Sequence, residues 1–278
     1  MLSPALTLAV LTAAIVHAVW NAITHGIKDQ VVAFGLLGAG GALAAIPLVA
    51  LSRAPSTASW PYIAASVVIH LFYTALLMRS YRYGEFSQVY PLARGTSPLV
   101  VTVFSAVFVH ERPSALGLAG VVVVSAGLAT LTFGGRRFAN RTAVIAAAGT
   151  GLTIASYTVV DGVGVRAAHS PGGYTGWLML IQSTDMIVIA LVIRRREFLR
   201  QRPSIATRGI LAGALSLVAY GLVLWAQTRG ALAPIAALRE TSVIFGAIIG
   251  AVFFREPFGR TRVVAAIVVA AGIVMLSG

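Results

Sequence analysis

Long apolar segments with very few charged residues make up most of this chain, and they constrain its fold more than any other feature. A helix of about 20 apolar residues is long enough to cross a bilayer. Ten segments meet this length: residues 4–24, 31–51, 60–80, 87–109, 114–134, 142–163, 173–193, 208–228, 231–254 and 259–277. They do not alternate polar and apolar residues as barrel strands do. The sequence therefore predicts an all-α integral membrane protein with ten transmembrane helices.

The composition agrees with a chain solvated mainly by lipid. Of 278 residues, 58% are hydrophobic and 10% are charged, against about 25% charged in soluble domains. The net charge of +13 comes mainly from arginines between the apolar segments, where they set topology and contact lipid headgroups, so we expect no nucleic-acid partner. The chain has no cysteine, which excludes disulfides and thiolate metal sites. We expect neither a metal nor a cofactor.

The second half of the sequence resembles the first. Residues 87–111 align with residues 232–256 at an offset of 145. The matched pairs include Arg94 with Arg239, Thr96 with Thr241, Ser97 with Ser242, and Glu111 with Glu256. Five helices in each copy is an odd number, so the second copy enters the membrane from the opposite side. We predict two inverted five-helix repeats, residues 1–138 and 139–278, an arrangement typical of transporters.

Four short motifs carry a family resemblance: HAVWNAITHG at 17–26, SYTVVDGVGVR at 156–166, VHERP at 109–113 and FREP at 254–257. With these motifs the chain resembles the ten-helix EamA-type members of the drug/metabolite transporter (DMT) superfamily over nearly its whole length. The resemblance implies a multi-pass transporter of the plasma membrane, in a bacterium the inner membrane. Members of that family move amino acids, sugars, nucleotide-linked metabolites or drugs, and the motifs do not specify which.

Ionisable residues inside membrane segments are costly and usually mark a functional interior. The most informative are Arg94 and Arg239, which as repeat equivalents should face each other. Two guanidinium groups in one cavity suit a carboxylate or phosphate, which each can hold with paired hydrogen bonds. In the alternative interpretation, Asp161, Asp185 or Glu240 neutralises each arginine, and the ion pairs only lock helices together.

Polar and aromatic residues in the first and sixth segments predict two walls of a central cavity. His17 and Asn21 share a helical face beside Trp20, and Tyr157 and Asp161 share a face in the second copy. The alternative assigns the aromatic residues to interfacial belts. Three further candidates for substrate binding are Tyr73, Tyr90 and Tyr220.

Asp161 and Glu240 are the candidates for proton coupling. A substrate that displaces an arginine from a carboxylate changes how readily that carboxylate takes up a proton. These two residues are therefore predicted to link substrate binding to proton movement.

Proline and glycine residues predict local features of the helices. Pro98 removes a helical hydrogen bond from the carbonyl of Arg94, so we expect the fourth segment to bend or unwind there, unless Thr102 or Ser97 satisfies that carbonyl. Glu111–Pro113 and Glu256–Pro257 are predicted as helix starts. The glycines predicted to allow close helix packing are Gly38, Gly40, Gly41, Gly246 and Gly250.

The basic residues predict an orientation that conflicts with the resemblance. One set of connections holds 15 lysines and arginines and the other set holds 4. The positive-inside rule places the first set in the cytoplasm and both termini outside. Members of the resembled family usually have both termini in the cytoplasm, so both orientations stay open at this point.

Together these observations predict a secondary transporter that uses alternating access. Its substrate is expected to be a small polar or amphipathic metabolite, such as an amino acid or another solute with a carboxylate or phosphate. The alternatives are an exporter of drugs or cationic compounds, a channel, or a membrane-embedded enzyme. No GxSxG, HExxH or P-loop pattern is present, so we expect no enzyme activity and no direct use of ATP. The expected partners are the solute, the lipid bilayer, and protons or another coupling ion, with the chain as a monomer or weak homodimer.

Overall fold

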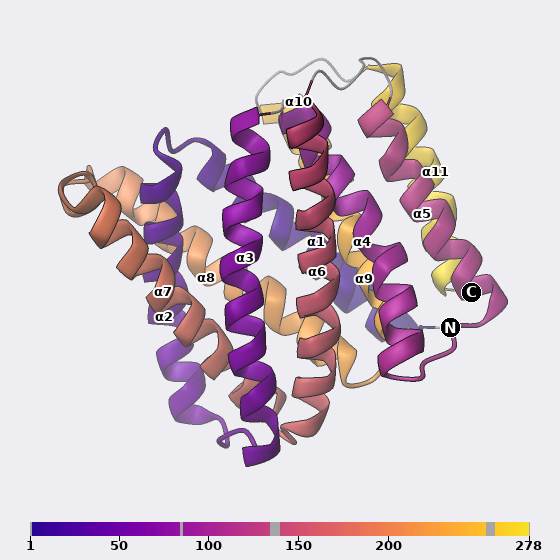
Figure 1. The fold of residues 1–278 in the computed structure, drawn as a ribbon, viewed down its shortest axis with the longest axis horizontal. Helices are drawn as coiled ribbons and strands as arrows, with labels where there is room; N and C mark the ends of the chain where they lie inside the picture. The colour runs from indigo at the N-terminus through magenta and orange to yellow at the C-terminus, as the bar shows by residue number, and fades with distance from the viewer. Residues whose placement is uncertain (1, 84–85, 134–139, 254–258, 278) are drawn as a thin grey trace.

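The computed structural model describes residues 2–83, 86–133, 140–253 and 259–277, and these ranges form helices with no strand (Figure 1). The elements in chain order are α1 (Pro4–His25), α2 (Gln30–Leu51), a 3-10 turn η1 (Thr57–Ser59), α3 (Trp60–Tyr83), α4 (Phe86–Phe108), α5 (Ala115–Phe133), α6 (Arg141–Ala167), α7 (Pro171–Leu199), α8 (Pro203–Gln227), α9 (Leu232–Glu240), α10 (Ser242–Phe253) and α11 (Arg260–Ser277).

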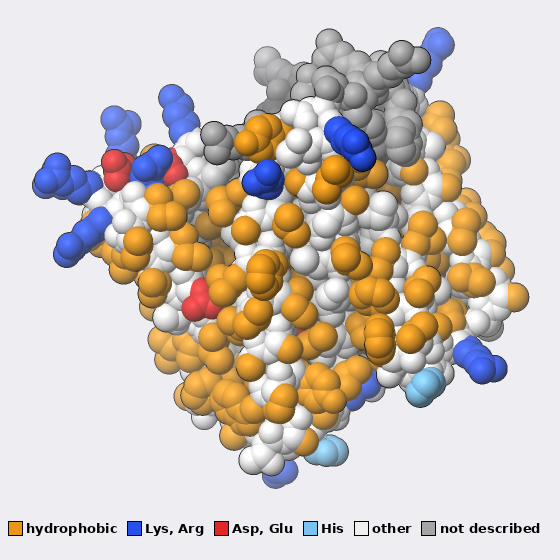
Figure 2. Space-filling model, viewed as in Figure 1, with side chains coloured by type: hydrophobic (Ala, Val, Ile, Leu, Met, Phe, Trp, Pro, Cys, Tyr) orange, Lys and Arg blue, Asp and Glu red, His pale blue; other side chains and the backbone are white. Residues whose placement is uncertain are grey.

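The outer surface of the helices is strongly apolar. Seven described helical segments, one of which runs from α9 into α10, are long and apolar enough to cross a membrane, and three shorter apolar helices accompany them. Large side chains such as Leu51, Val192 and Val274 are 88%, 79% and 70% exposed, and hydrophobic side chains cover most of the face in Figure 2. An apolar surface this extensive requires lipid around it. The protein is an all-helical, multi-pass membrane protein, and the count of ten spans stays a prediction.

Several helices begin at polar residues that cap their first turn. The Asp29 carboxylate accepts hydrogen bonds from the backbone N–H groups of Val31 and Val32 at the start of α2, at 2.9 and 3.3 Å. Asn140 caps α6 in the same way through Thr142 N at 2.8 Å. Such caps satisfy amide groups that have no partner within the helix.

The start of α5 differs from the prediction. Its cap is Ser114, whose hydroxyl accepts from the backbone N–H of Gly117 at 3.1 Å. Glu111 and Pro113 precede this cap, so the prediction that they form the first turn of the helix is wrong. Glu111 is used elsewhere, as described below. The corresponding residues, Glu256 and Pro257, lie outside the described residues.

Helices of the two halves of the chain pack between one another. Helix α1 packs against α8 and α3 against α6, while α2 packs against α7 and α5 against α11. The α2–α8 contact depends on Gly40 and Gly213, because a Cβ at either position would overlap the backbone of the facing helix. The packing predicted for Gly40 is thus confirmed. Gly246 has open space around it, so its predicted packing role is wrong, and the surroundings of Gly250 lie outside the described part of the chain.

The two ends of the bundle differ in charge. Helix α1 begins and α11 ends at one end, which we call the termini end, and Leu2 N–H donates there to the carbonyl of Leu276 at 3.4 Å (Figure 1). The opposite end, which we call the basic end, holds the α7–α8 connection with the arginines from Arg194 to Arg208. Blue side chains gather around that connection in Figure 2.

The ninth apolar segment is interrupted, whereas the fourth is not. Helix α9 ends at Glu240, and the N–H of the next residue, Thr241, donates to the carbonyl of Leu238 at 3.1 Å, a 3-10-type bond that tightens the last turn. The Thr241 hydroxyl donates to the same carbonyl at 2.6 Å. The carbonyl of Thr241 then accepts from Ile244 N at 2.9 Å at the start of α10. Helix α4 continues through Pro98. The prediction that α4 unwinds there is wrong, and the break lies in the other half, one residue after Glu240.

Candidate substrate-binding and coupling site

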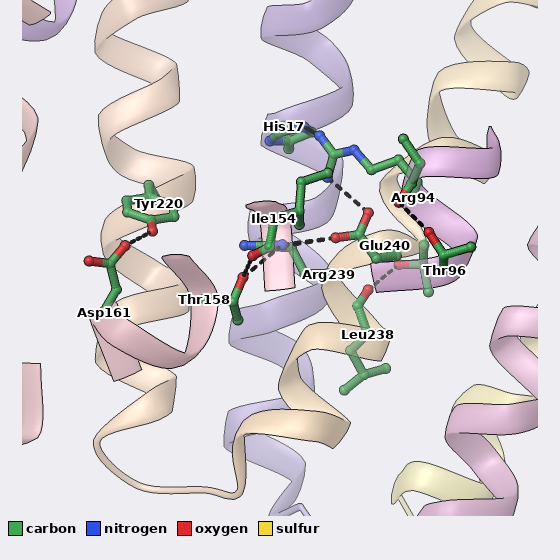
Figure 3. Close-up of polar contacts among 12 residues, drawn as sticks. His17, Arg94, Thr96, Ile154, Thr158, Asp161, Tyr220, Leu238, Arg239 and Glu240 are labelled. Carbon is green, nitrogen blue, oxygen red and sulfur yellow. Dashed lines mark hydrogen bonds and ion pairs between the residues drawn. The ribbon is translucent and has the colours of Figure 1, made fainter. Parts of the chain in front are cut away.

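Two arginines from different halves of the chain bind one carboxylate. Arg94 of α4 donates from Nη1 to Oε2 of Glu240 at 2.9 Å. Arg239 of α9 donates to the other oxygen, Oε1, from Nη2 at 2.9 Å and from Nε at 3.2 Å. Figure 3 shows both guanidinium groups directed toward the Glu240 carboxylate. The structure thus brings the predicted pair together, with Glu240 between them.

This cluster is deeply buried. The Glu240 side chain is 0% exposed, and the side chains of Arg94 and Arg239 are each 5% exposed. Buried charges are tolerated only when they are paired and hydrogen-bonded. Two guanidinium groups share one carboxylate here, so these three side chains carry a formal excess of one positive charge. The cluster both joins the helices and provides an environment that favours an anion.

His17 of α1 extends the cluster on one side. Arg94 Nη2 lies 2.6 Å from the imidazole Nε2 of His17. Because a guanidinium can only donate, this ring nitrogen acts as the acceptor. The His17 ring also meets Trp20 edge to face, with 4.8 Å between ring centroids. The first helix therefore contributes directly to the arginine cluster.

Helix α6 closes the other side of the cluster. Thr158 Oγ1 accepts from Arg239 Nη2 at 3.3 Å, and the Arg239 guanidinium lies 5.7 Å from the centre of the Tyr157 ring. A guanidinium over an aromatic face is a favourable contact. Tyr157 thus links the arginine cluster to a group of aromatic residues in the interior.

Asp161, one turn further along α6, forms a second buried centre. Its carboxylate is 0% exposed and accepts hydrogen bonds from the hydroxyls of Tyr174, at 2.9 Å, and Tyr220 (Figure 3). Gly164 makes this arrangement possible, because a Cβ at that position would overlap the Tyr174 ring. The Asp161 carboxylate is therefore satisfied mainly by tyrosine hydroxyls from α7 and α8.

Aromatic rings line the space between these two centres. The His70 ring of α3 stacks on Tyr157 with centroids 4.0 Å apart, and Tyr73 meets Tyr157 edge to face at 5.9 Å. The Tyr220 ring lies 6.4 Å from that of Tyr157. His70 Nδ1 is held 2.9 Å from the carbonyl of Ser66. Three helices, α3, α6 and α8, thus place one aromatic group beside both Arg239 and Asp161.

The other predicted residues contribute less or are not described. Asn21 donates its amide to the carbonyl of His17 at 2.8 Å, within its own helix. Trp20 Nε1 is buried without a hydrogen-bond partner among the described residues. Asp185 is partly exposed on α7 and is absent from the arginine cluster. The side chain of Tyr90 lies outside the described part of the chain.

Ser97 and Ser242 add a further sign of a polar interior. They occupy equivalent positions in the two halves, each three residues after its arginine. Both hydroxyls are buried, and neither has a hydrogen-bond partner among the described residues. Buried polar groups of this kind usually bind water or a ligand.

Sequence reasoning missed Tyr174 and Thr158. Tyr174 lies near the start of α7, where an aromatic residue is usually interfacial, and only packing against Gly164 directs it toward Asp161. Thr158 stands within the SYTVVDGVGVR motif, so the motif could have identified it.

Among the described residues, no group of three His, Cys, Asp or Glu is placed to hold a metal ion. A separate pocket of about 440 Å³ lies at the termini end beside Trp225 and Arg229.

Comparison with known proteins finds a family model that matches almost half of the chain. Residues 141–278 match the model of the EamA-like transporter family. A solved crystal structure, described only as that of a protein, is similar with a TM-score of 0.75 and 17% sequence identity, covering 98% of this chain and 96% of that chain. At that identity the likeness concerns the fold alone. No curated protein matches the chain.

Proposed function

Because residues 141–278 are an EamA domain of the drug/metabolite transporter superfamily, we propose that this chain is a secondary transporter for a small solute that bears an anionic group. The EamA family is one of membrane transporters, which favours transport over catalysis. The single observation that carries the proposal is the convergence of Arg94 and Arg239 on one carboxylate.

The proposed architecture is ten transmembrane helices in two inverted repeats, residues 1–138 and 139–278, that rock against each other. It is supported by the way the two halves interleave, with α1 against α8 and α3 against α6. The interruption between α9 and α10 at Thr241 adds support, because broken helices in transporters commonly lie at substrate sites. The proposed location is the plasma membrane, in a bacterium the inner membrane, with the chain as a monomer or weak homodimer.

Arg94 and Arg239 are proposed to bind the anionic group of the substrate. Their present ligand, Glu240, has the chemistry of such a group, with one oxygen for each guanidinium. A substrate carboxylate or phosphate would compete with Glu240 for the same donors. The hydroxyls of Ser97 and Ser242, which have no partner in the described part of the chain, follow the two arginines by three positions and would bind other polar groups of the substrate. Aromatic contacts from Tyr157, Tyr73 and Tyr220 would hold its less polar part.

Asp161 and Glu240 are proposed to couple transport to protons. Glu240 loses an arginine partner whenever the substrate binds, and a carboxylate that loses its counter-charge in a buried site is driven to take up a proton. Asp161 accepts from Tyr174 and Tyr220, so its protonation would rearrange helices α7 and α8. Asp161→Asn and Glu240→Gln should each remove the dependence of transport on a pH gradient. Coupling that survives both changes would rule this out.

A cationic substrate is the second candidate, and Asp161 is the observation that favours it. A buried carboxylate beside Tyr220, with Tyr157 and His70 near by, offers charge and aromatic faces to an ammonium group. A solute with both charges would use both centres, its anionic group at the arginines and its ammonium group at Asp161.

Counterflow in proteoliposomes tests the proposal directly. Proteoliposomes that contain the purified chain are loaded with amino acids, organic acids, phosphonates or cationic dyes. Exchange of the internal solute for a labelled external solute is then measured. We expect exchange of a solute with an anionic group, lost in Arg239→Ala and weakened in Arg94→Lys, which keeps the charge but not the paired geometry. Exchange of cationic dyes that is unaffected by Arg94→Ala and Arg239→Ala would favour the second candidate instead. Flux without saturation or counterflow would indicate a channel.

A further inference from the structure

Polar contacts gather at the termini end, away from the arginine cluster. Arg166, in the last turn of α6, uses all three guanidinium nitrogens there. Nη1 donates to Glu111 Oε1 at 2.6 Å, Nε to the carbonyl of Gln227 at 2.8 Å, and Nη2 to the carbonyl of Gly230 at 2.8 Å. One side chain thus ties the end of α6 to the α4–α5 connection and to the α8–α9 connection.

Glu111 uses its second oxygen to cap α9. Oε2 accepts from the backbone N–H of Leu232, the first residue of that helix, at 2.8 Å. The residue in the cap position, Ala231, provides no side-chain hydrogen bond. A carboxylate at a helix N-terminus satisfies a free amide and is favoured by the helix dipole. The cap for α9 therefore comes from a residue 121 positions earlier in the chain.

The backbone before Glu111 is shaped to deliver it. His110 has φ of 58°, in the left-handed region that non-glycine residues rarely adopt. The N–H of Glu111 bonds back to the carbonyl of Ser105 at 3.1 Å, just after α4 ends. A backbone conformation of this kind persists only where surrounding contacts hold it. Glu111 is thus fixed from both its backbone and its side chain.

A short polar path leads from this assembly to the arginine cluster. The Gln227 amide donates from Nε2 to the carbonyl of Thr158 at 3.4 Å, and the Thr158 hydroxyl accepts from Arg239 at 3.3 Å. In parallel, α9 runs from its capped residue Leu232 to Arg239 and Glu240 at its other end. One helix of nine residues therefore connects the contact of Glu111 with Leu232 to the arginine cluster.

We infer that Glu111 and Arg166 form a latch that sets the position of α9 and closes the termini end of the transport pathway. The inference deepens the proposed function, because alternating access requires one end to be closed while the other is open. Opening the termini end separates Glu111 from Arg166 and from Leu232, and α9 carries Arg239 and Glu240 with it. The two latch residues are positioning residues, since they act on the solute only through α9.

Cysteine accessibility tests the latch in the full chain, which has no cysteine of its own. Gln227→Cys places a thiol at a side chain that is 1% exposed, behind the latch, and leaves the backbone carbonyl that Arg166 binds. Its reaction with impermeant methanethiosulfonates is measured in right-side-out and inside-out vesicles. Glu111→Gln and Arg166→Lys should each raise the rate about tenfold, as expected when one charge-assisted hydrogen bond is lost from the closed state. The increase should occur only from the compartment that faces the termini end.

Matched controls separate opening from other effects. Cationic and anionic reagents are used in parallel, because removing the Glu111 charge alone would shift their rates in opposite directions, whereas opening raises both. Asp29→Asn breaks the 2.9 Å ion pair with Arg194 at the basic end and should leave the rate unchanged. If Glu111→Gln does not fold, Arg166→Lys decides the matter.

Unchanged rates in the folded variants, or a fast reaction of Gln227→Cys alone, would overturn the latch. The measurement needs no substrate, so this outcome leaves the anion site standing. Conversely, the counterflow of anionic solutes could fail while the thiol reaction rates of Gln227→Cys respond as expected. That result would reject the proposed substrate and keep the latch.

Discussion

The guanidinium of Arg94 and the carboxylate of Glu240 form a buried ion pair of 2.9 Å between residues 146 positions apart. The pair joins α4 in the first half of the chain to α9 in the second. Glu240 also binds Arg239, while the residue after Arg94 at the equivalent place is Gly95. One carboxylate therefore serves two equivalent arginines, and we expect its loss to have the largest effect in the cluster.

Glu240→Gln should lower thermal stability more than Arg94→Gln does. Without Glu240 two buried guanidinium groups lose their counter-charge, and removing one partner of a buried pair costs about 3–5 kcal/mol. Without Arg94 the carboxylate still has Arg239, so we expect a loss of about 1–2 kcal/mol. Melting in detergent, followed by fluorescence-detected size exclusion, measures both.

Added anions provide the control for this prediction. A carboxylate solute that binds the two arginines should restore much of the stability of Glu240→Gln and little of that of Arg239→Gln, since ligands stabilise only the state they bind. If Arg94→Gln were less stable than Glu240→Gln, that result would contradict a central role for Glu240.

Gly40→Ala should destabilise the protein far more than Gly246→Ala. A methyl group at position 40 overlaps the backbone of Ile210, so α2 and α8 must move apart, whereas position 246 has open space. We expect a loss of about 2 kcal/mol or more for the first change. The second should be neutral or stabilising by up to about 1 kcal/mol, because alanine is the better helix former. Melting temperatures compare the two, and equal losses would contradict the close approach of α2 and α8.

The length and apolar character of the segments were sufficient to predict a helical membrane protein, because a chain in lipid must satisfy its backbone within each segment. The repeat alignment also singled out Arg94 and Arg239, which the structure brings to one carboxylate. The break in the ninth segment was not predictable from proline rules. Helix α4 is continuous through Pro98, whereas the interruption lies at Thr241, a position without a proline.

Long-range partners were beyond the reach of sequence patterns. Glu111 before Pro113 looks like a helix start, yet its carboxylate caps α9 and pairs with Arg166. Tyr174 reaches Asp161 only because Gly164 leaves room for its ring. Such contacts depend on how helices distant in sequence pack, and no local spacing encodes that.

The Asp29–Arg194 ion pair predicts a small loss of stability in acid. Partial burial raises the pKa of Asp29, but hydrogen bonds from Arg194 and from the N–H groups of Val32 and Val31 outweigh it and hold the pKa below its usual value. A carboxylate with a lowered pKa in the folded state stabilises above its unfolded pKa, and this contribution is lost as pH falls through the folded pKa. The loss therefore occurs below about pH 4.

Asp29→Asn checks this pH dependence. Asparagine keeps the helix cap but not the charge, so the variant should lose the pair at all pH values and show a flatter stability curve below about pH 4. The side chains of Asp29 and Arg194 are 36% and 47% exposed, so we expect a difference of less than about 1 kcal/mol at neutral pH. Asp29→Ala should cost about 1 kcal/mol more, through loss of the cap. Identical acid limbs for all three proteins would show that the pair contributes nothing.

The distribution of arginine predicts which compartment each end of the bundle faces. One set of connections holds 15 basic residues and the other 4, so the positive-inside rule places the basic end in the cytoplasm and the termini end, with its latch, outside. Single cysteines at Ser204 and Ala58, both exposed and at opposite ends, test this in the cysteine-free chain. Ala58→Cys should react with an impermeant thiol reagent in intact cells, and Ser204→Cys only after permeabilisation. The reverse pattern would mean that the family's usual orientation overrides the charge distribution, and that the latch opens toward the cytoplasm.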